Sequence, residues 1–152
     1  MQIQGLQKLT MLDYPGRTAC TVFLSGCNFR CPFCHNAPLL TAADEDGMDE
    51  DDLLAFLKKR QGLLDGVAVT GGEPLLRPEL PALLEKIKAL GYAIKLDTNG
   101  AFPEQLEAVV RAGLADYVAM DIKNSPARYA ETAGVPGLAL TPIFRSVSFL
   151  LR

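Results

Sequence analysis

Short apolar segments alternate with amphipathic segments along most of the chain. The apolar segments are rich in β-branched side chains, which is typical of buried strands, and they are residues 19–24, 66–70, 92–96 and 117–122. The amphipathic segments carry apolar side chains at helical spacing, and they are residues 51–61, 79–90, 104–112 and a helix that begins with Thr141 as its side-chain cap and Pro142. This alternation predicts an α/β fold with a parallel sheet, either open and doubly wound or curved into part of a (β/α) barrel.

Polar or glycine-rich residues directly follow every predicted strand. These residues are 27–36, 71–74, 97–100 and 121–123. In both candidate architectures the carboxyl ends of the strands lie at one edge of the sheet, where chemistry gathers. The sequence therefore predicts one active site built from these segments.

Composition and charge narrow the class of protein. The 152 residues are 49% hydrophobic and 22% charged, which predicts a single globular domain over residues 1–152. The net charge of -3 provides no basic excess for binding nucleic acid. The sequence has neither an evident signal peptide nor an apolar run long enough to span a bilayer, so we expect a cytoplasmic protein with no membrane partner.

Three cysteines form the strongest chemical signal. Cys27, Cys31 and Cys34 have the spacing C-x3-C-x2-C, which lets one short loop surround a single metal centre. Four-iron clusters normally take four cysteine ligands, so three would leave one iron open to an outside ligand. A structural zinc site that includes His35 is the alternative, although neighbouring residues such as Cys34 and His35 do not easily face one tetrahedral ion. Cys20 lies within an apolar strand, where packing accounts for it.

The cysteine spacing, with Phe33 just before the last cysteine, resembles the signature of the radical S-adenosylmethionine (SAM) enzymes. Residues 13–16 (DYPG), 23–27 (FLSGC), 34–36 (CHN), 71–74 (GGEP), 97–100 (DTNG) and 121–123 (DIK) resemble the branch that activates glycyl-radical enzymes, and within it the activators of anaerobic ribonucleoside-triphosphate reductase. The resemblance implies a TIM-like partial (β/α) barrel of the radical SAM type. About four strand–helix units are present of the roughly six expected for such a barrel.

The resemblance also implies the chemistry. A 4Fe-4S cluster held by Cys27, Cys31 and Cys34 would reductively cleave S-adenosylmethionine, and the resulting radical would take a hydrogen from a glycine of a partner glycyl radical enzyme. The cluster and SAM would carry this oxidoreductase chemistry, without a catalytic side chain, under anaerobic conditions. A reductant such as flavodoxin or ferredoxin would supply the electron.

The cofactor-binding residues follow from the same resemblance. Gly71 and Gly72 would present backbone groups to the amino group of SAM, with Glu73 and Pro74 fixing the loop. Phe33 would lean on the adenine, with His35 and Asn36 nearby. The remaining residues would hold the ribose, a bridging monovalent cation or the SAM carboxylate, and they are Asp97, Thr98, Asp121 and Lys123.

Several alternatives remain open on the sequence. The partner could be pyruvate formate-lyase or another glycyl radical enzyme, or the substrate could be a small molecule or a peptide. Many peptide-maturing relatives carry more cysteines towards the C-terminus, and this chain has none after Cys34. A non-catalytic zinc-binding module is the third class. Because the chain resembles a barrel truncated at its C-terminus, we expect an exposed apolar sheet edge and poor activity of the isolated chain.

Overall fold

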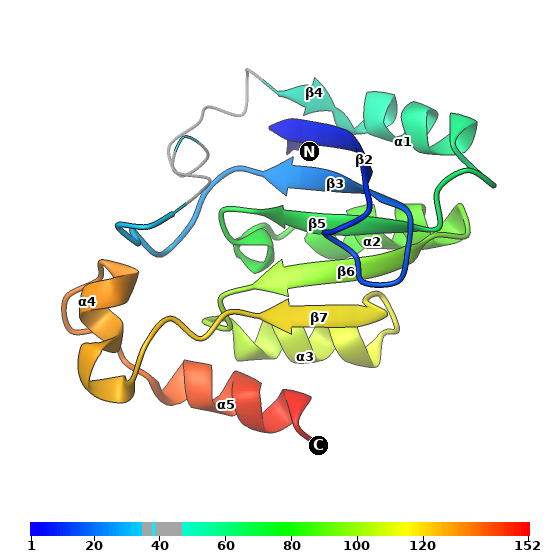
Figure 1. The fold of residues 1–152 in the computed structure, drawn as a ribbon. Coiled ribbons are helices and arrows are strands. Elements are labelled where there is room, and N and C mark those ends of the chain that lie inside the picture. The colour runs from blue at the N-terminus through cyan, green and yellow to red at the C-terminus, as the bar shows by residue number, and fades with distance from the viewer. Residues whose placement is uncertain (35–37, 39–46) are drawn as a thin grey trace.

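A five-stranded sheet in the order β2-β3-β5-β6-β7 forms the centre of the molecule (Figure 1). The computed structural model describes residues 1–34, 38 and 47–152. The four strands after β2 run parallel to one another, and they are β3 (Ala19–Leu24), β5 (Gly66–Gly71), β6 (Ala93–Thr98) and β7 (Tyr117–Met120). The predicted parallel α/β architecture is therefore confirmed, with strand ends that differ from prediction by one or two residues.

Three helices cover one face of this sheet (Figure 1). They are α1 (Glu50–Lys59), α2 (Leu80–Ala89) and α3 (Pro103–Arg111), and all three were predicted. Alternate strand residues such as Val22, Val69 and Leu96 are fully buried with the leucines of these helices in one hydrophobic cluster. Burial of this apolar surface is the main stabilising contribution to the fold. Because the three helices cover only one face of the sheet, the other face of the parallel strands is available for a site.

Several short elements were not predicted. β2 (Gly5–Thr10) pairs antiparallel with β3, and β1 (Gln2–Ile3) pairs antiparallel with β4 (Met48–Asp49). Among the described residues, two 3-10 turns, η3 (Pro74–Leu76) and η4 (Pro126–Arg128), and the five-residue helix α4 (Tyr129–Ala133) were also not predicted. These elements are too short or too polar to show a clear hydrophobic period.

The last helix, α5 (Thr141–Leu150), packs beside α3 (Figure 1). The prediction that Thr141 caps this helix is wrong. Leu140 is the N-cap, because its carbonyl already accepts the N–H of Phe144 at 3.0 Å, and no side chain caps the helix. Arg145 contacts Glu104 at 2.6 Å and Glu107 at 3.0 Å on α3.

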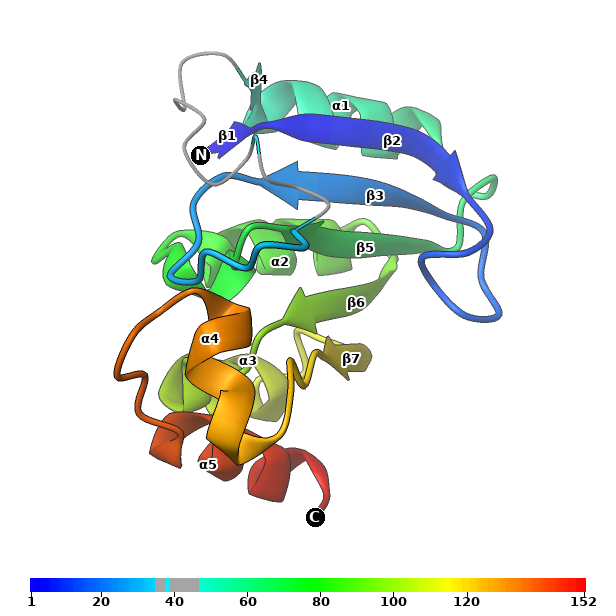
Figure 2. The same ribbon diagram turned by 60° about the vertical axis from the view of Figure 1, so that its left-hand side comes forward.

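The carboxyl ends of the parallel strands face α4, which Figure 2 brings to the front. At one side of the described sheet β7 is the edge strand. Tyr117 at its start and Ile122 just beyond it are 43% and 58% exposed, respectively. Among the described residues this edge is therefore partly apolar and open, as expected.

Candidate functional site

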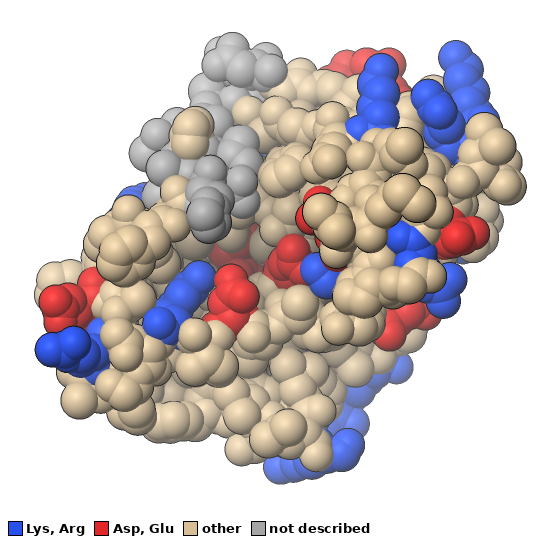
Figure 3. Space-filling view, in the orientation of Figure 1, with Lys and Arg blue, Asp and Glu red and all other residues tan. Residues whose placement is uncertain are grey.

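A cavity of about 440 Å³ lies at the carboxyl ends of the parallel strands, and Figure 3 shows the hollow with charged side chains around it. This volume is within the range of cofactor and small-molecule sites. The predicted site residues that line it are Cys27, Cys31, Phe33, Cys34, Gly71, Gly72, Glu73, Asp97, Thr98, Asp121 and Lys123. Pro74 does not line the cavity; it is buried as the first residue of η3. His35 and Asn36 lie outside the described residues.

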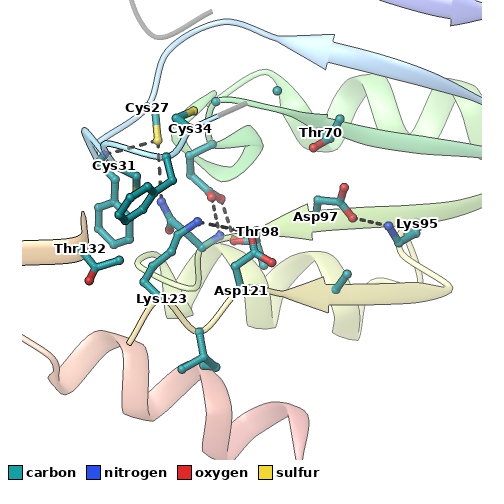
Figure 4. A pocket seen from close by; sticks show the side chains of 18 residues that line it. Cys27, Cys31, Cys34, Thr70, Lys95, Asp97, Thr98, Asp121, Lys123 and Thr132 are labelled. Carbon is teal, nitrogen blue, oxygen red and sulfur yellow. Dashed lines mark hydrogen bonds and ion pairs between the residues drawn. The ribbon is translucent and has the colours of Figure 1, made fainter. Parts of the chain in front are cut away.

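The three cysteines lie on the loop that follows β3 (Figure 4), and α4 contacts this loop. Phe29 inserts its ring into a second apolar cluster with Tyr129 and Ala133 of α4. The N–H of Arg30 donates to the carbonyl of Ala133 at 2.8 Å. These contacts hold the loop against the cavity, with all three cysteines half-buried.

The cysteine set fits an iron–sulfur cluster, because its three thiols line one shared cavity and thiolates are the usual ligands of such clusters. His35, the fourth ligand of the alternative zinc site, lies outside the described residues. Burial raises the pKa of the Cys27 thiol, and a metal centre would be needed to favour its thiolate. Cys20 is fully buried in β3, where burial raises the pKa of its thiol to about 12. Cys20 is therefore a core residue.

Gly71 and Gly72 pack directly on the start of the cysteine loop. The N–H of Gly72 donates to the carbonyl of Leu24 at 3.0 Å, and the N–H of Glu73 donates to the carbonyl of Gly26 at 2.8 Å. A Cβ on Gly72 would overlap the Gly26 carbonyl oxygen, and one on Gly71 would overlap the Leu24 backbone. The glycines are therefore required sterically for the two loops to meet, in addition to any contact with a ligand.

Glu73 is the most buried charged group of the site, at 1% exposure. Its carboxylate accepts from the hydroxyl of Thr98 at 2.7 Å, from the N–H of Asn99 at 2.7 Å and from the N–H of Leu75 at 3.2 Å. Burial raises the pKa of Glu73 to about 7, although these hydrogen bonds act in the opposite direction. Glu73 thus ties the glycine loop to the end of β6.

Thr98 was expected to hold the ribose or a cation. In the structure its hydroxyl donates to Glu73 and accepts from the N–H of Gly100 at 3.1 Å. The side chain is 4% exposed. Its hydroxyl therefore contributes chiefly to the loop itself.

Each of the two aspartates in the cavity is paired with a lysine two residues away (Figure 4). Asp97 lies 2.6 Å from the ammonium of Lys95, and Asp121 lies 3.4 Å from that of Lys123. Burial lowers the pKa of Lys123, but the nearby charges of Asp121 and Cys31 outweigh this, so its pKa is raised. Asp121 and Lys123 thus face the same way, as predicted.

Lys95 was not predicted as a site residue, and Asn99 lies in the predicted segment 97–100 but had no individual role assigned to it. Lys95 lines the cavity, and its signal is the alternation Ile94, Lys95, Leu96, Asp97 in a strand that would otherwise be apolar throughout. Asn99 is 6% exposed and hydrogen-bonded to the cysteine loop. Its place in a tight turn after the strand gave no separate signal.

A scan against protein families matches the model described as the radical SAM superfamily over residues 21–144. The chain belongs to the radical SAM superfamily. This family implies S-adenosylmethionine and a 4Fe-4S cluster as its cofactors. The parallel α/β fold with the cysteine loop after its first parallel strand agrees with this membership.

Relatives of more than one activity are similar to this radical SAM chain. A protein of Methanocaldococcus jannaschii named for the activation of glycyl-radical enzymes is 33% identical over 133 residues, which covers 85% of the chain and 53% of that protein. A 7-carboxy-7-deazaguanine synthase of Hyperthermus butylicus is 33% identical over 135 residues, which covers 85% of the chain and 51% of that protein. The chain thus spans about half the length of these curated relatives.

A solved structure has the same fold. TYW1 with a bound lysine–pyruvate adduct superposes with a TM-score of 0.57 at 16% identity, covering 88% of the chain and 50% of TYW1. At this identity the likeness concerns the fold alone. Within the described part of the chain, the helices are all too short or too polar to cross a bilayer.

Proposed function

We propose that this domain is the cofactor-binding part of a radical SAM activase that generates a glycyl radical on a partner enzyme. The observation that carries the proposal is the convergence of the predicted cysteine, glycine and aspartate segments on one cavity. Cys27, Cys31 and Cys34 would hold the cluster, leaving one iron for SAM. When bound, the cluster and SAM supply the one-electron cleavage chemistry of the family.

The residues of the chain would bind and orient the cofactor. Lys123 lines the cavity and forms a loose ion pair, at 3.4 Å, with Asp121, whose side chain is 76% exposed to solvent. The charge of Lys123 is therefore available to the carboxylate of SAM. Phe33 is 76% exposed at the cavity, where its ring could cover the adenine. Glu73 and Asn99 would hold the surrounding loops in position through their hydrogen bonds.

Two observations support an activase. The motifs at residues 13–16, 97–100 and 121–123 resemble the activating branch, and the relative from Methanocaldococcus jannaschii is named for this activity. Anaerobic ribonucleoside-triphosphate reductase is the partner that we propose, with pyruvate formate-lyase as the second choice. The other half of such a barrel would contribute to the surface that receives the glycine-bearing loop.

A small-molecule substrate is the second candidate function. The sequence identity to a 7-carboxy-7-deazaguanine synthase is 33% over 135 residues, the same percentage as the identity to the activating enzyme over 133 residues. Lys95 also places a partly buried ammonium in the cavity beside Asp97, which is a group that could bind an anionic substrate.

The first experiment tests the cofactors. The chain is reconstituted anaerobically with iron and sulfide, reduced with dithionite and mixed with S-adenosylmethionine, and we expect a 4Fe-4S spectrum and formation of 5′-deoxyadenosine. Cys31→Ala should lose the cluster, whereas the matched control Cys20→Ala should retain it because Cys20 lies in the core. A protein that binds only zinc would contradict the proposal.

The second experiment separates the two functions. The full-length protein is incubated with the anaerobic reductase and, in parallel, with pyruvate formate-lyase, and the glycyl radical is detected by its EPR doublet. An active SAM-cleaving protein that yields no glycyl radical on either partner would favour the small-molecule function.

A further inference from the structure

Asn99 connects the loop after β6 to the cysteine loop. Its side-chain NH2 group donates to the side-chain oxygen of Asn28 at 2.9 Å and to the sulfur of Cys27 at 3.9 Å. Its own side-chain oxygen accepts the N–H of Ala101 at 2.9 Å. Because Ala101 offers a donor, the amide oxygen must face it, and the NH2 group must face the cysteine loop.

The backbone of Asn99 is fixed as well. Its N–H donates to the buried carboxylate of Glu73 at 2.7 Å. The side chain is therefore held from both ends, by Glu73 and Ala101 on one side and by the cysteine loop on the other. A group held in this way loses little further freedom when it orients a neighbouring ligand.

The sulfur of Cys27 accepts two N–H groups. Besides Asn99, the backbone N–H of Phe29 donates to it at 3.4 Å. Hydrogen bonds to cluster-ligating sulfurs stabilise the more negative, reduced state of an iron–sulfur cluster and so raise its reduction potential. Asn99 is thus an N–H donor that reaches a proposed ligand from a different strand end.

We propose that Asn99 is a positioning residue that orients Cys27 and raises the reduction potential of the cluster. This inference rests on the proposed function, because it requires Cys27 to be a ligand. Since Asn99 lies two residues after Asp97, the same short segment would contact both the cofactor cavity and the cluster ligand. Asn99 raises the reduction potential of the cluster and is not required for assembly of the cluster.

The test is an EPR redox titration of the reconstituted protein in the absence of S-adenosylmethionine. Asn99→Ser and Asn99→Asp both keep an oxygen for the N–H of Ala101 but lose the N–H donor to Cys27. We expect about a tenfold smaller equilibrium constant for reduction with Asn99→Ser, which is a midpoint potential about 59 mV more negative. Asn99→Asp should shift the potential further, because it adds a negative charge.

The matched control is Gln61→Glu, an exposed amide outside the cavity whose side chain donates to the carbonyl of Leu90 at 2.9 Å. It should leave the potential unchanged. The inference is overturned if both Asn99 variants hold a full cluster at the wild-type potential, and also if neither variant assembles a cluster. Failure of the proposed function itself is distinguishable, because the wild-type protein would then hold no 4Fe-4S cluster.

Discussion

The hydroxyl of Thr98 donates to the carboxylate of Glu73 at 2.7 Å, and so joins the ends of two parallel strands inside the protein. Because the same carboxylate also accepts two backbone N–H groups, it makes three hydrogen bonds within the protein. Glu73 thus holds the two loops of the cavity wall together.

Glu73→Gln should destabilise the fold. A glutamine oxygen can serve Thr98 and Leu75, but its NH2 group then faces the N–H of Asn99, which is left without an acceptor. We expect a loss of about 1–3 kcal/mol in the free energy of unfolding, measured by urea denaturation. Glu79→Gln, at a side chain that is 49% exposed, should change it by less than about 0.5 kcal/mol. Equal effects of the two substitutions would contradict this role of Glu73.

The stability of the chain should fall as the pH rises from about 4.5 to 7. Burial raises the pKa of Glu73 from 4.5 to about 7, so the folded state binds this proton more tightly than the unfolded state does. Stability is then highest below the unfolded pKa and decreases until the pH exceeds the folded value. The expected loss is on the order of 2–3 kcal/mol.

Urea denaturation at intervals between pH 4.5 and 8 measures this dependence. The matched comparison is Glu73→Gln, which has no proton to lose at this position. A wild-type pH dependence that persists unchanged in the variant would show that another group causes it.

Gly72→Ala should disrupt the cysteine loop. The new methyl group would overlap the Gly26 carbonyl and would also approach the Cβ of Cys27 to 3.1 Å, so the loop must shift. We expect a loss of about 1–3 kcal/mol in stability and a lower iron content after reconstitution. Gly5→Ala is the control, because its methyl group would meet the Phe23 ring at an ordinary 3.4 Å. Full iron loading of Gly72→Ala would refute the steric argument.

Ser146→Ala should weaken the attachment of α5. The buried hydroxyl of Ser146 donates to the carbonyl of Gly100 at 2.7 Å, and its removal leaves that carbonyl without this partner. The expected cost is about 1–2 kcal/mol, read from the urea midpoint. Ser148→Ala, on the exposed side of the same helix, should have no measurable effect, and a comparable cost there would argue for helix propensity as the cause.

The buried parallel strands and their helices were predictable from sequence because a continuous apolar run or a regular helical period identifies each of them. β6 was placed correctly, but the prediction ended it at Leu96, whereas Asp97 and Thr98 form its last two residues. These two polar side chains line the cavity at the end of the strand. A hydropathy pattern predicts a loop for such polar residues.

The contacts between loops were not predictable in the same way. The motifs indicated which residues meet at the cavity, but the partner of each side chain depends on tertiary packing. The hydroxyl of Thr98 faces Glu73, and the amide of Asn99 faces Cys27. Neither orientation has a signature in local sequence, since the partners are separated by many residues.

The support of the cysteine loop by α4 has a consequence for the order of folding. The hydrogen bond from Arg30 to Ala133 joins segments about a hundred residues apart, and such distant contacts form late because closing a long loop costs chain entropy. During synthesis the cysteines also leave the ribosome before α4 does, because they lie about a hundred residues earlier in the chain. We expect the cysteine loop to reach its final conformation only after the segment that follows β7 has docked, so insertion of the proposed cluster would be a late step.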